Sequence, residues 1–230
     1  MRTVAIIVAA GKGERVGAKL PKQFLNIGNK PILAHTLEKF EKARLVNEVV
    51  VVVSEDYLGF CSREIIDAYE FGKIKRVVSG GKHRQDSVFN GLKSIDSNID
   101  IVLIHDGARP FVKSQKIDQI IRACQKDGST ILALPIKETI KRVEKGKVIT
   151  TLDRSKIWSV QTPQAFPYKV ILDAYKKAKK DKFIATDDSL LVERVGIEVR
   201  VIEGDNDNIK ITTIQDLEMA EYLVGSKYKG

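Results

Sequence analysis

The sequence predicts an α/β protein built on one doubly wound, mainly parallel sheet. Short apolar runs alternate with segments of helical periodicity from residue 3 to residue 134, and this alternation is typical of parallel sheets. Two of the runs, residues 4–8 and 49–53, are apolar throughout, as expected of strands covered on both faces. Glycine-rich or polar loops follow several of the runs, at the strand ends where open α/β sheets bind ligands.

Each element is predicted from its own pattern. The apolar runs predict strands at residues 4–8, 49–53, 74–79, 101–104, 129–134 and 197–203. Helical spacing and capping residues predict helices at residues 31–40, 56–69, 87–95, 114–125, 167–179 and 189–194, and a last helix that opens at the capping box Thr213–Asp216. The whole chain, residues 1–230, is expected to form a single domain.

The totals restrict the class of protein. The chain has 230 residues, a net charge of +9 and 43% hydrophobic residues, which suits a globular protein with an anionic ligand. The basic residues are spread along the chain, so nucleic acid is not the expected partner. Cys61 and Cys124 are isolated, no apolar run is long enough to span a membrane, and no signal peptide is visible. We therefore expect a cytoplasmic protein without a membrane partner.

The loop after the first strand is the strongest ligand signal. Gly11, Gly13 and Gly17 fall within seven residues, together with Lys12, Arg15, Lys19 and Lys22. Glycine N–H groups and nearby cations suit a polyphosphate. The spacing fits neither a P-loop nor a dinucleotide fingerprint, so the loop alone indicates only a nucleoside triphosphate or a sugar phosphate.

Two later strand ends carry matching features. Gly80 and Gly81 precede a basic cluster and a helix, an arrangement that places backbone donors and cations near an anion. Asp106 follows the strand at 101–104, where a carboxylate facing phosphates is best explained by a bridging Mg²⁺. A turn-forming role, or a pairing with Arg109, is the alternative for Asp106. Because we expect the two glycine loops to follow neighbouring strands, they should form a single crevice.

The alternation changes after residue 134. Residues 139–151 predict two short strands around a Lys-Gly turn, and this basic hairpin has little apolar content. A lone hairpin is marginally stable, so the arm at about residues 137–156 is expected to protrude and to contact a second subunit.

Several motifs resemble those of the 2-C-methyl-D-erythritol 4-phosphate cytidylyltransferase family. The resemblance covers residues 3 to about 224, and the motifs occur in the family's order. They are Ala9-Ala10-Gly11-x-Gly13-x-Arg15-x-Gly17 with Pro21-Lys22-Gln23-Phe24, Gly80-Gly81-x-x-Arg84-x-x-Ser87-Val88, His105-Asp106-Gly107-Ala108-Arg109-Pro110, Gln161-Thr162-Pro163-Gln164, Thr186-Asp187-Asp188 and Asp207-Asn208-Ile209-Lys210-Ile211-Thr212.

The resemblance implies a Rossmann-like nucleotidyltransferase that transfers a cytidylyl group from CTP to methylerythritol phosphate, with release of pyrophosphate, in non-mevalonate isoprenoid biosynthesis. It implies direct attack of the acceptor phosphate on the α-phosphorus, a divalent cation such as Mg²⁺ with Asp106 as its ligand, and a homodimer joined through the hairpin arm. The transition-state stabilisers would be Arg15 and Lys22. The CTP-binding residues would be Ala9, Ala10, Gly11, Lys12, Gly13, Gly81, Lys82, Ser87, Asp106 and Gly107. The acceptor-binding residues would be Arg109, Thr139, Arg154, Thr162, Thr186 and Lys210, with Thr139 and Arg154 serving the partner's site.

Three alternatives stay open at this stage. A ribitol 5-phosphate cytidylyltransferase would use the same loops and a different acceptor pocket. Another sugar-nucleotide pyrophosphorylase would bind a different base. A basic nucleic-acid-binding module is a third possibility, although aromatic residues make up only 7% of the chain and do not interleave with a basic patch.

Overall fold

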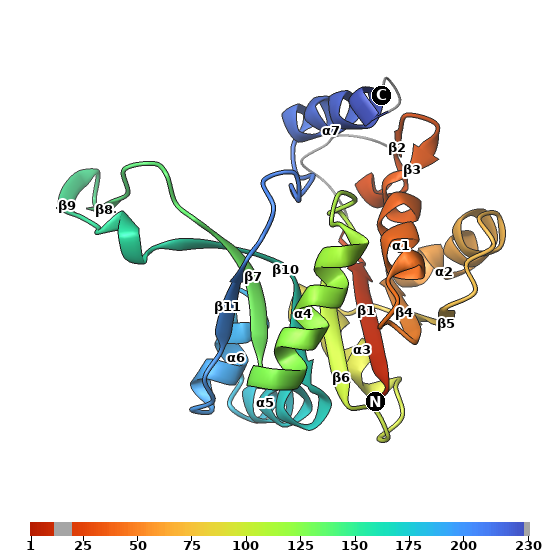
Figure 1. Cartoon of the computed structure of the whole chain (residues 1–230), viewed down its shortest axis with the longest axis horizontal. Coiled ribbons are helices and arrows are strands. Elements are labelled where there is room, and N and C mark those ends of the chain that lie inside the picture. Colours follow the sequence, from red (N-terminus) through yellow and green to blue (C-terminus); the bar gives the residue numbers. More distant parts are fainter. Residues whose placement is uncertain (12–19, 228–230) are drawn as a thin grey trace.

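The computed structural model describes residues 1–11 and 20–227, and it contains a central seven-stranded sheet (Figure 1). The strands lie in the order β11-β7-β10-β6-β1-β4-β5. Their bounds are β1 Thr3–Ala9, β4 Glu48–Val53, β5 Ile74–Ser79, β6 Ile101–Asp106, β7 Thr130–Pro135, β10 Trp158–Pro167 and β11 Arg200–Glu203. All pairings are parallel except those of β10, which runs antiparallel to both β6 and β7. The predicted doubly wound, mainly parallel sheet is confirmed.

Helices cover both faces of the sheet, and the alternation of side chains along the strands gives each face its own core. On one face, Ala5 and Ile7 of β1 pack with α1 (Ile32–Lys42) and α4 (Ser114–Asp127). On the other, Val4 and Ile6 pack with helices from later in the chain. These are α3 (Arg84–Lys93), α5 (Tyr168–Lys180) and α6 (Ser189–Arg194). Burial on both sides explains why β1 after Thr3 and β4 after Glu48 are apolar.

Three local expectations differ from the structure. Residues 56–69 form a mixed helical stretch, with a 3-10 turn η3 (Glu55–Tyr57), one turn of α-helix α2 (Leu58–Phe60) and a π-helix η4 (Cys61–Asp67). Helix α3 begins at Arg84, three residues before the predicted start, because the Asp86 carboxylate accepts the N–H of His83 at 3.0 Å and caps the earlier turn. Strand β10 was not predicted.

The hairpin arm projects from the sheet (Figure 1). Strands β8 (Lys141–Glu144) and β9 (Lys147–Thr151) pair antiparallel around a turn in which Lys145 and Gly146 have φ angles of 49° and 76°. All residues of both strands are exposed. The expected hairpin is therefore present at the expected place.

The C-terminal part of the chain returns to the carboxyl edge of the sheet. Helix α7 (Ile214–Lys227) packs on a small hairpin formed by β2 (Asn26–Ile27) and β3 (Lys30–Pro31). Its first turn is capped as predicted, since Asp216 accepts the N–H groups of Thr212 and Thr213 at 2.8 Å. The segment before α7 is tied to the sheet by the Ile211 N–H, which donates to the Ala108 carbonyl at 2.9 Å. This bond places Lys210 beside the end of β6.

None of the helices in the described part of the chain combines the length and the apolar character needed to cross a membrane.

Candidate active site

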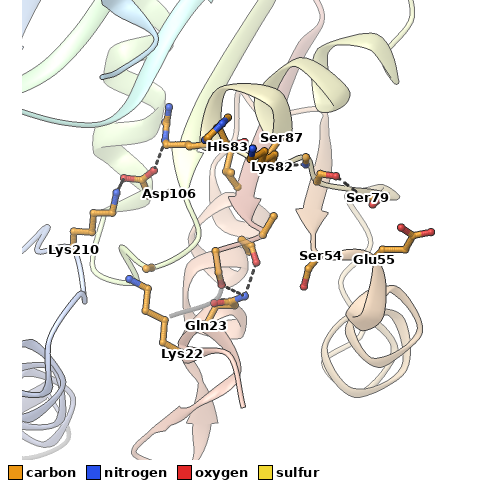
Figure 2. Close-up of a pocket in the computed structure, with 18 residues that line it drawn as sticks. Lys22, Gln23, Ser54, Glu55, Ser79, Lys82, His83, Ser87, Asp106 and Lys210 are labelled. Carbon is orange, nitrogen blue, oxygen red and sulfur yellow. Dashed lines mark hydrogen bonds and ion pairs between the residues drawn. The ribbon is translucent and has the colours of Figure 1, made fainter. Parts of the chain in front are cut away.

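A cavity of about 540 Å³ opens at the carboxyl ends of the parallel strands (Figure 2). Loops after β1, β4, β5 and β6 border it, together with the 3-10 turn η2 (Lys22–Phe24) and the segment before α7. The glycine loops follow β1 and β5. Contrary to expectation, these two strands are not neighbours, because β4 lies between them. Both loops nevertheless border the same cavity. Its lining residues are Val8, Ala9, Ala10, Gly11, Lys22, Gln23, Ser54, Glu55, Ser79, Gly80, Gly81, Lys82, His83, Arg84, Ser87, Asp106, Ala108 and Lys210.

Asp106 is the electrostatic centre of one side of this cavity. Its carboxylate accepts from Arg84 Nε at 3.1 Å and from Lys210 Nζ at 2.9 Å, and Arg109 Nε lies 3.5 Å away. Burial favours the neutral acid, but the three cations outweigh burial and hold the pKa of Asp106 far below its usual value. The residue is thus a permanent anion beside cations that a phosphate group would also attract.

A buried chain of hydrogen bonds fixes the backbone of Asp106. Its N–H donates to Thr162 Oγ1 at 3.0 Å, and that hydroxyl lies 3.0 Å from His105 Nδ1. His105 Nε2 lies 3.1 Å from the Arg109 carbonyl, which can only accept, so Nε2 carries the proton and Nδ1 accepts from Thr162. Burial lowers the pKa of His105 to about 3, so the ring is neutral. Thr162 therefore uses its only proton inside the protein.

Small residues let backbone segments approach one another along the side of the cavity formed by the glycine loops. A Cβ at Gly80 would lie 2.4 Å from the Cβ of Ala10, and a Cβ at Gly81 would lie 2.4 Å from that of Asp86. The Gly81 N–H donates to Ser87 Oγ at 3.1 Å. A side chain at Gly80 would push the loop away from the segment after β1, and one at Gly81 would push it away from α3, so either would reshape the cavity.

Turn η2 connects the start of the first loop to the other side of the site. The buried amide of Gln23 donates to the carbonyls of Ala9 and Gly11, at 2.6 and 3.1 Å. Next to it, Lys22 Nζ donates to the Ile211 carbonyl at 2.7 Å. Figure 2 shows Lys22 and Lys210 reaching toward the Asp106 side of the cavity from separate elements. Two ammonium groups far apart in the sequence are thus brought to one place.

Most of the predicted site residues that the structure describes gather here. Those lining the cavity are Ala9, Ala10, Gly11, Lys22, Gly81, Lys82, Ser87, Asp106 and Lys210. Gly107, Arg109 and Thr162 lie directly behind it through their contacts with Ala9, Asp106 and His105. Thr139, Arg154 and Thr186 are exposed and do not line it. Lys12, Gly13 and Arg15 lie outside the described residues.

Sequence reasoning assigned no role to three residues that shape this site, namely Arg84, Asp188 and Gln23. Arg84 lines the cavity and binds Asp188 with two hydrogen bonds, at 3.0 and 2.7 Å. Gln23 joins the ends of the first loop. All three stand inside motifs that carried the family resemblance, so their sequence signal was present, but nothing in their spacing showed what they contact.

The described residues contain no group of three or more His, Cys, Asp or Glu side chains able to hold a metal ion. Mg²⁺ commonly takes one or two carboxylates and completes its shell with water and substrate phosphates. Asp106 is ionised and borders the cavity, and among the residues that the structure describes its second oxygen faces the partly exposed Lys210 and the largely buried Arg109. The chain therefore fits a cation that is held mainly by a bound nucleotide.

These features define a class of protein. A parallel sheet with a glycine-lined cavity at its carboxyl edge, converging lysines and one carboxylate is the arrangement of a nucleotidyltransferase, in which positive charge receives a polyphosphate. The sequence model of the family "2-C-methyl-D-erythritol 4-phosphate cytidylyltransferase" matches residues 3–226. The chain belongs to this family and is a cytidylyltransferase.

Relatives and solved structures agree. The protein of this name from Geobacter metallireducens is 42% identical over 99% of this chain and 99% of its own length. The one from Clostridium botulinum is 47% identical over 95% of this chain and 96% of its own length. A crystal structure of 4-diphosphocytidyl-2C-methyl-D-erythritol synthase from Anaerococcus prevotii has a TM-score of 0.87 and 33% identity, covering 97% of this chain and 96% of that one. The similarity is not confined to the motifs, because it extends over nearly the whole fold.

Proposed function

We propose that the chain transfers the cytidylyl group of CTP to 2-C-methyl-D-erythritol 4-phosphate, forming 4-diphosphocytidyl-2-C-methyl-D-erythritol and pyrophosphate for isoprenoid precursor synthesis. The observation that carries the proposal is the cavity beside the glycine loops, in which Arg84 and Lys210 pair with Asp106 and Lys22 also belongs to the lining. The family membership identifies the nucleotide and the acceptor that such a cavity would receive.

The reaction brings two anions together. A phosphate oxygen of the acceptor attacks the α-phosphorus of CTP, and the bond to the β-phosphate oxygen breaks, so pyrophosphate leaves with the electron pair. Catalysis of such a step consists mostly of positioning and charge stabilisation. We assign the charge near the reacting phosphorus to Lys22, with Arg15 as the second stabiliser expected from the family resemblance.

The nucleotide would lie along the glycine side of the cavity. We assign Ala9, Ala10, Gly81 and Ser87 to the base and ribose. Their small side chains leave room in the cavity, so that a ligand could approach the backbone closely there. The remaining nucleotide contacts would come from Gly11, Lys12, Gly13, Lys82, Asp106 and Gly107. Mg²⁺, held by the triphosphate and by Asp106, would supply charge neutralisation of the phosphates.

The acceptor would lie on the Lys210 side. In the absence of a ligand Lys210 pairs with Asp106, so a bound phosphate would take over this ammonium group. Arg109 supports the same wall and donates to the Asn208 carbonyl at 2.8 Å. Thr162 would act by holding Asp106, since its own proton is already donated to His105. Thr186 would reach the acceptor only by a movement of its loop.

We further propose a homodimer joined through the arm. Exposed apolar side chains cluster on the arm and on the outer half of β10, with exposures between 41% and 61%. They are Val143, Val148, Ile149, Trp158 and Val160. Covering them with a second copy would remove apolar surface from water. Thr139 and Arg154 lie on this arm, away from the cavity of their own chain, and would complete the cavity of the partner.

A mixing experiment tests the shared site. With the acceptor well below its KM, Lys22→Met and Arg154→Ala should each retain about a tenth of the native activity or less when assayed alone. A mixed dimer would contain one site with both native residues, so an equimolar mixture refolded together should recover about one quarter of the native activity. If the mixture shows only the average of the two variants, each chain completes its own site and the shared-site proposal is wrong.

The chemistry has a direct test of its own. CTP labelled at the α-phosphorus is incubated with Mg²⁺ and methylerythritol phosphate, and the products are separated. Label should pass into a cytidine diphosphate ester only when the acceptor is present, with one pyrophosphate released for each ester formed. Pyrophosphate release without transfer of label would contradict the proposal.

We assign the protein to a reducing compartment, the cytoplasm, on the state of its cysteines. Cys61 and Cys124 are free and buried, as is usual for proteins of reducing compartments. This supports a cytoplasmic enzyme, and the labelled-CTP assay in a soluble cell fraction would check it.

A further inference from the structure

Asp188 is a fully buried carboxylate outside the cavity. It accepts two hydrogen bonds from Arg84 and one from the hydroxyl of Tyr175 on α5. A helix-capping role does not explain why this carboxylate is buried, because the side chain of Asp188 makes no capping bond to α6. Its neighbour Asp187 does that work and accepts the Leu190 N–H at 3.2 Å.

The two bonds from Arg84 restrict where that side chain can point. Arg84 Nη1 and Nη2 both lie on Asp188, at 3.0 and 2.7 Å, and together they fix the plane of the guanidinium group. The third nitrogen, Nε, then donates to Asp106 Oδ1 at 3.1 Å. A lysine or a singly bonded arginine would have no such fixed direction.

As a consequence, the two carboxylate oxygens of Asp106 have different partners. Oδ1 is held by Arg84 from the α3 side, and Oδ2 faces Lys210 and Arg109. The side chain of Lys210 is flexible and 39% exposed. A ligand can therefore reach Asp106 Oδ2 by displacing the ammonium group of Lys210. The orientation of the carboxylate toward the cavity therefore depends on Arg84.

We propose that Asp188 is a positioning residue of the nucleotide cavity: it fixes Arg84, and Arg84 presents Asp106 to the bound nucleotide. The proposal rests on the assignment of this cavity to CTP. A buried ion pair adds little net stability, since desolvation offsets the attraction, but it imposes a geometry. Asp188, at the start of α6, thus connects α6 and α5 to the carboxyl edge of the sheet, where Asp106 lies, through the side chain of Arg84 on α3.

A double-mutant cycle tests the proposal. Calorimetry measures the Kd of Mg·CTP for the native chain, Asp188→Asn, Arg84→Gln and the double variant, and pyrophosphate release gives kcat and KM. Asp188→Asn should raise the Kd at least about tenfold in the native chain and less than about twofold in the Arg84→Gln background, because Asp188 acts through Arg84. Equal effects in both backgrounds would overturn the proposal.

Two further variants keep the test decisive if Asp188→Asn fails to fold. Arg84→Lys keeps the charge and leaves Asp188 in place, but lysine cannot bind both carboxylates with a fixed plane, so the Kd for Mg·CTP should again rise about tenfold. Tyr175→Phe removes the third bond to Asp188 and leaves the Arg84 pair intact. It should lower the thermal midpoint and change the Kd less than about twofold.

The outcomes separate this proposal from the function on which it rests. If the native chain does not bind Mg·CTP, the proposed function is contradicted and the role of Asp188 falls with it. If the native chain binds but Arg84→Lys and Asp188→Asn bind equally well, only the role of Asp188 is overturned.

Discussion

Replacing Lys22 by methionine removes one positive charge while keeping the length and most of the packing of the side chain. Lys22 Nζ donates to the carbonyl of Ile211 at 2.7 Å, a neutral acceptor on the segment that also carries Lys210. The reacting phosphates would offer Lys22 an anionic acceptor instead. We therefore expect the variant to lose stabilisation chiefly in the transition state.

The size of the effect follows from these two partners. Removing one preorganised donor to a developing charge costs about 2.7–4 kcal/mol. Lys22 must give up its bond to Ile211 to act, and a typical net hydrogen bond is worth about 1 kcal/mol. The net loss is then roughly 2–3 kcal/mol, a fall in kcat of about 30- to 150-fold at 25 °C.

The assay is steady-state pyrophosphate release with saturating Mg²⁺, CTP and methylerythritol phosphate, with the CTP Kd measured separately by calorimetry. The Kd should change less than about threefold, since the charge acts mainly in the transition state. Lys116→Met is the matched control, because Lys116 donates to a backbone carbonyl, that of Glu203, away from the cavity. A Lys22→Met enzyme with native kcat, or one that loses CTP binding instead of kcat, would refute the reasoning.

Three further predictions concern the arm, acid stability and the cysteines. Arg154→Ala should raise the KM for the acceptor about tenfold and leave the CTP Kd unchanged, as expected for one lost charge-assisted bond, and calorimetry showing the reverse would place Arg154 in the nucleotide site. Burial raises the pKa of Glu38, but hydrogen bonds from two lysines outweigh burial and lower it to about 2. Its stabilisation is therefore present above the unfolded pKa near 4.5 and is lost as pH falls toward 2, so Glu38→Gln should cost about 1–2 kcal/mol in urea unfolding at pH 6 after solvent screening, with the gap closing by pH 2. Burial raises the pKa of the Cys61 and Cys124 thiols to about 12, so neither should react with a thiol reagent at pH 8 until urea unfolds the chain, and rapid labelling of the native protein would contradict the observed burial.

Much of the fold could be predicted because the parallel strands are buried on both faces. Such strands are apolar throughout, and the helices between them carry a clear period, so residues 4–8 and 49–53 were assigned from pattern alone. The position of Asp106 followed from the same logic, since a polar residue just past a buried strand marks the ligand edge. The hairpin was predicted from its alternation and its Lys-Gly turn.

Strand β10 could not be predicted in the same way. Its inner half carries Gln161, Thr162 and Gln164, whose polar side chains suggest a loop. In the structure these side chains are buried and satisfied by partners far away, such as the Asp205 carbonyl for Gln161. The start of α3 differs for a local reason, because the helix is capped at His83 through Asp86, and histidine is not one of the residues that usually mark a helix N-cap.

The residues that hold the site together were therefore harder to find than the residues that face the ligand. Asp188 lies outside the cavity and Gln23 lines it, but both act through bonds to other parts of the protein, and no local pattern encodes those contacts. Family resemblance named the motifs in which they occur, and the structure supplied the contacts.

The comparison of two acceptors tests the central claim most directly. With Mg²⁺ and CTP held fixed, kcat/KM for pyrophosphate release is measured with methylerythritol phosphate and with ribitol 5-phosphate in parallel. We predict a value at least about a hundredfold higher with methylerythritol phosphate, because Lys210 and the arm residues would fit one acceptor while a wrong acceptor leaves polar groups unpaired. Equal or higher efficiency with ribitol 5-phosphate would leave the nucleotide cavity in place and contradict the assigned acceptor.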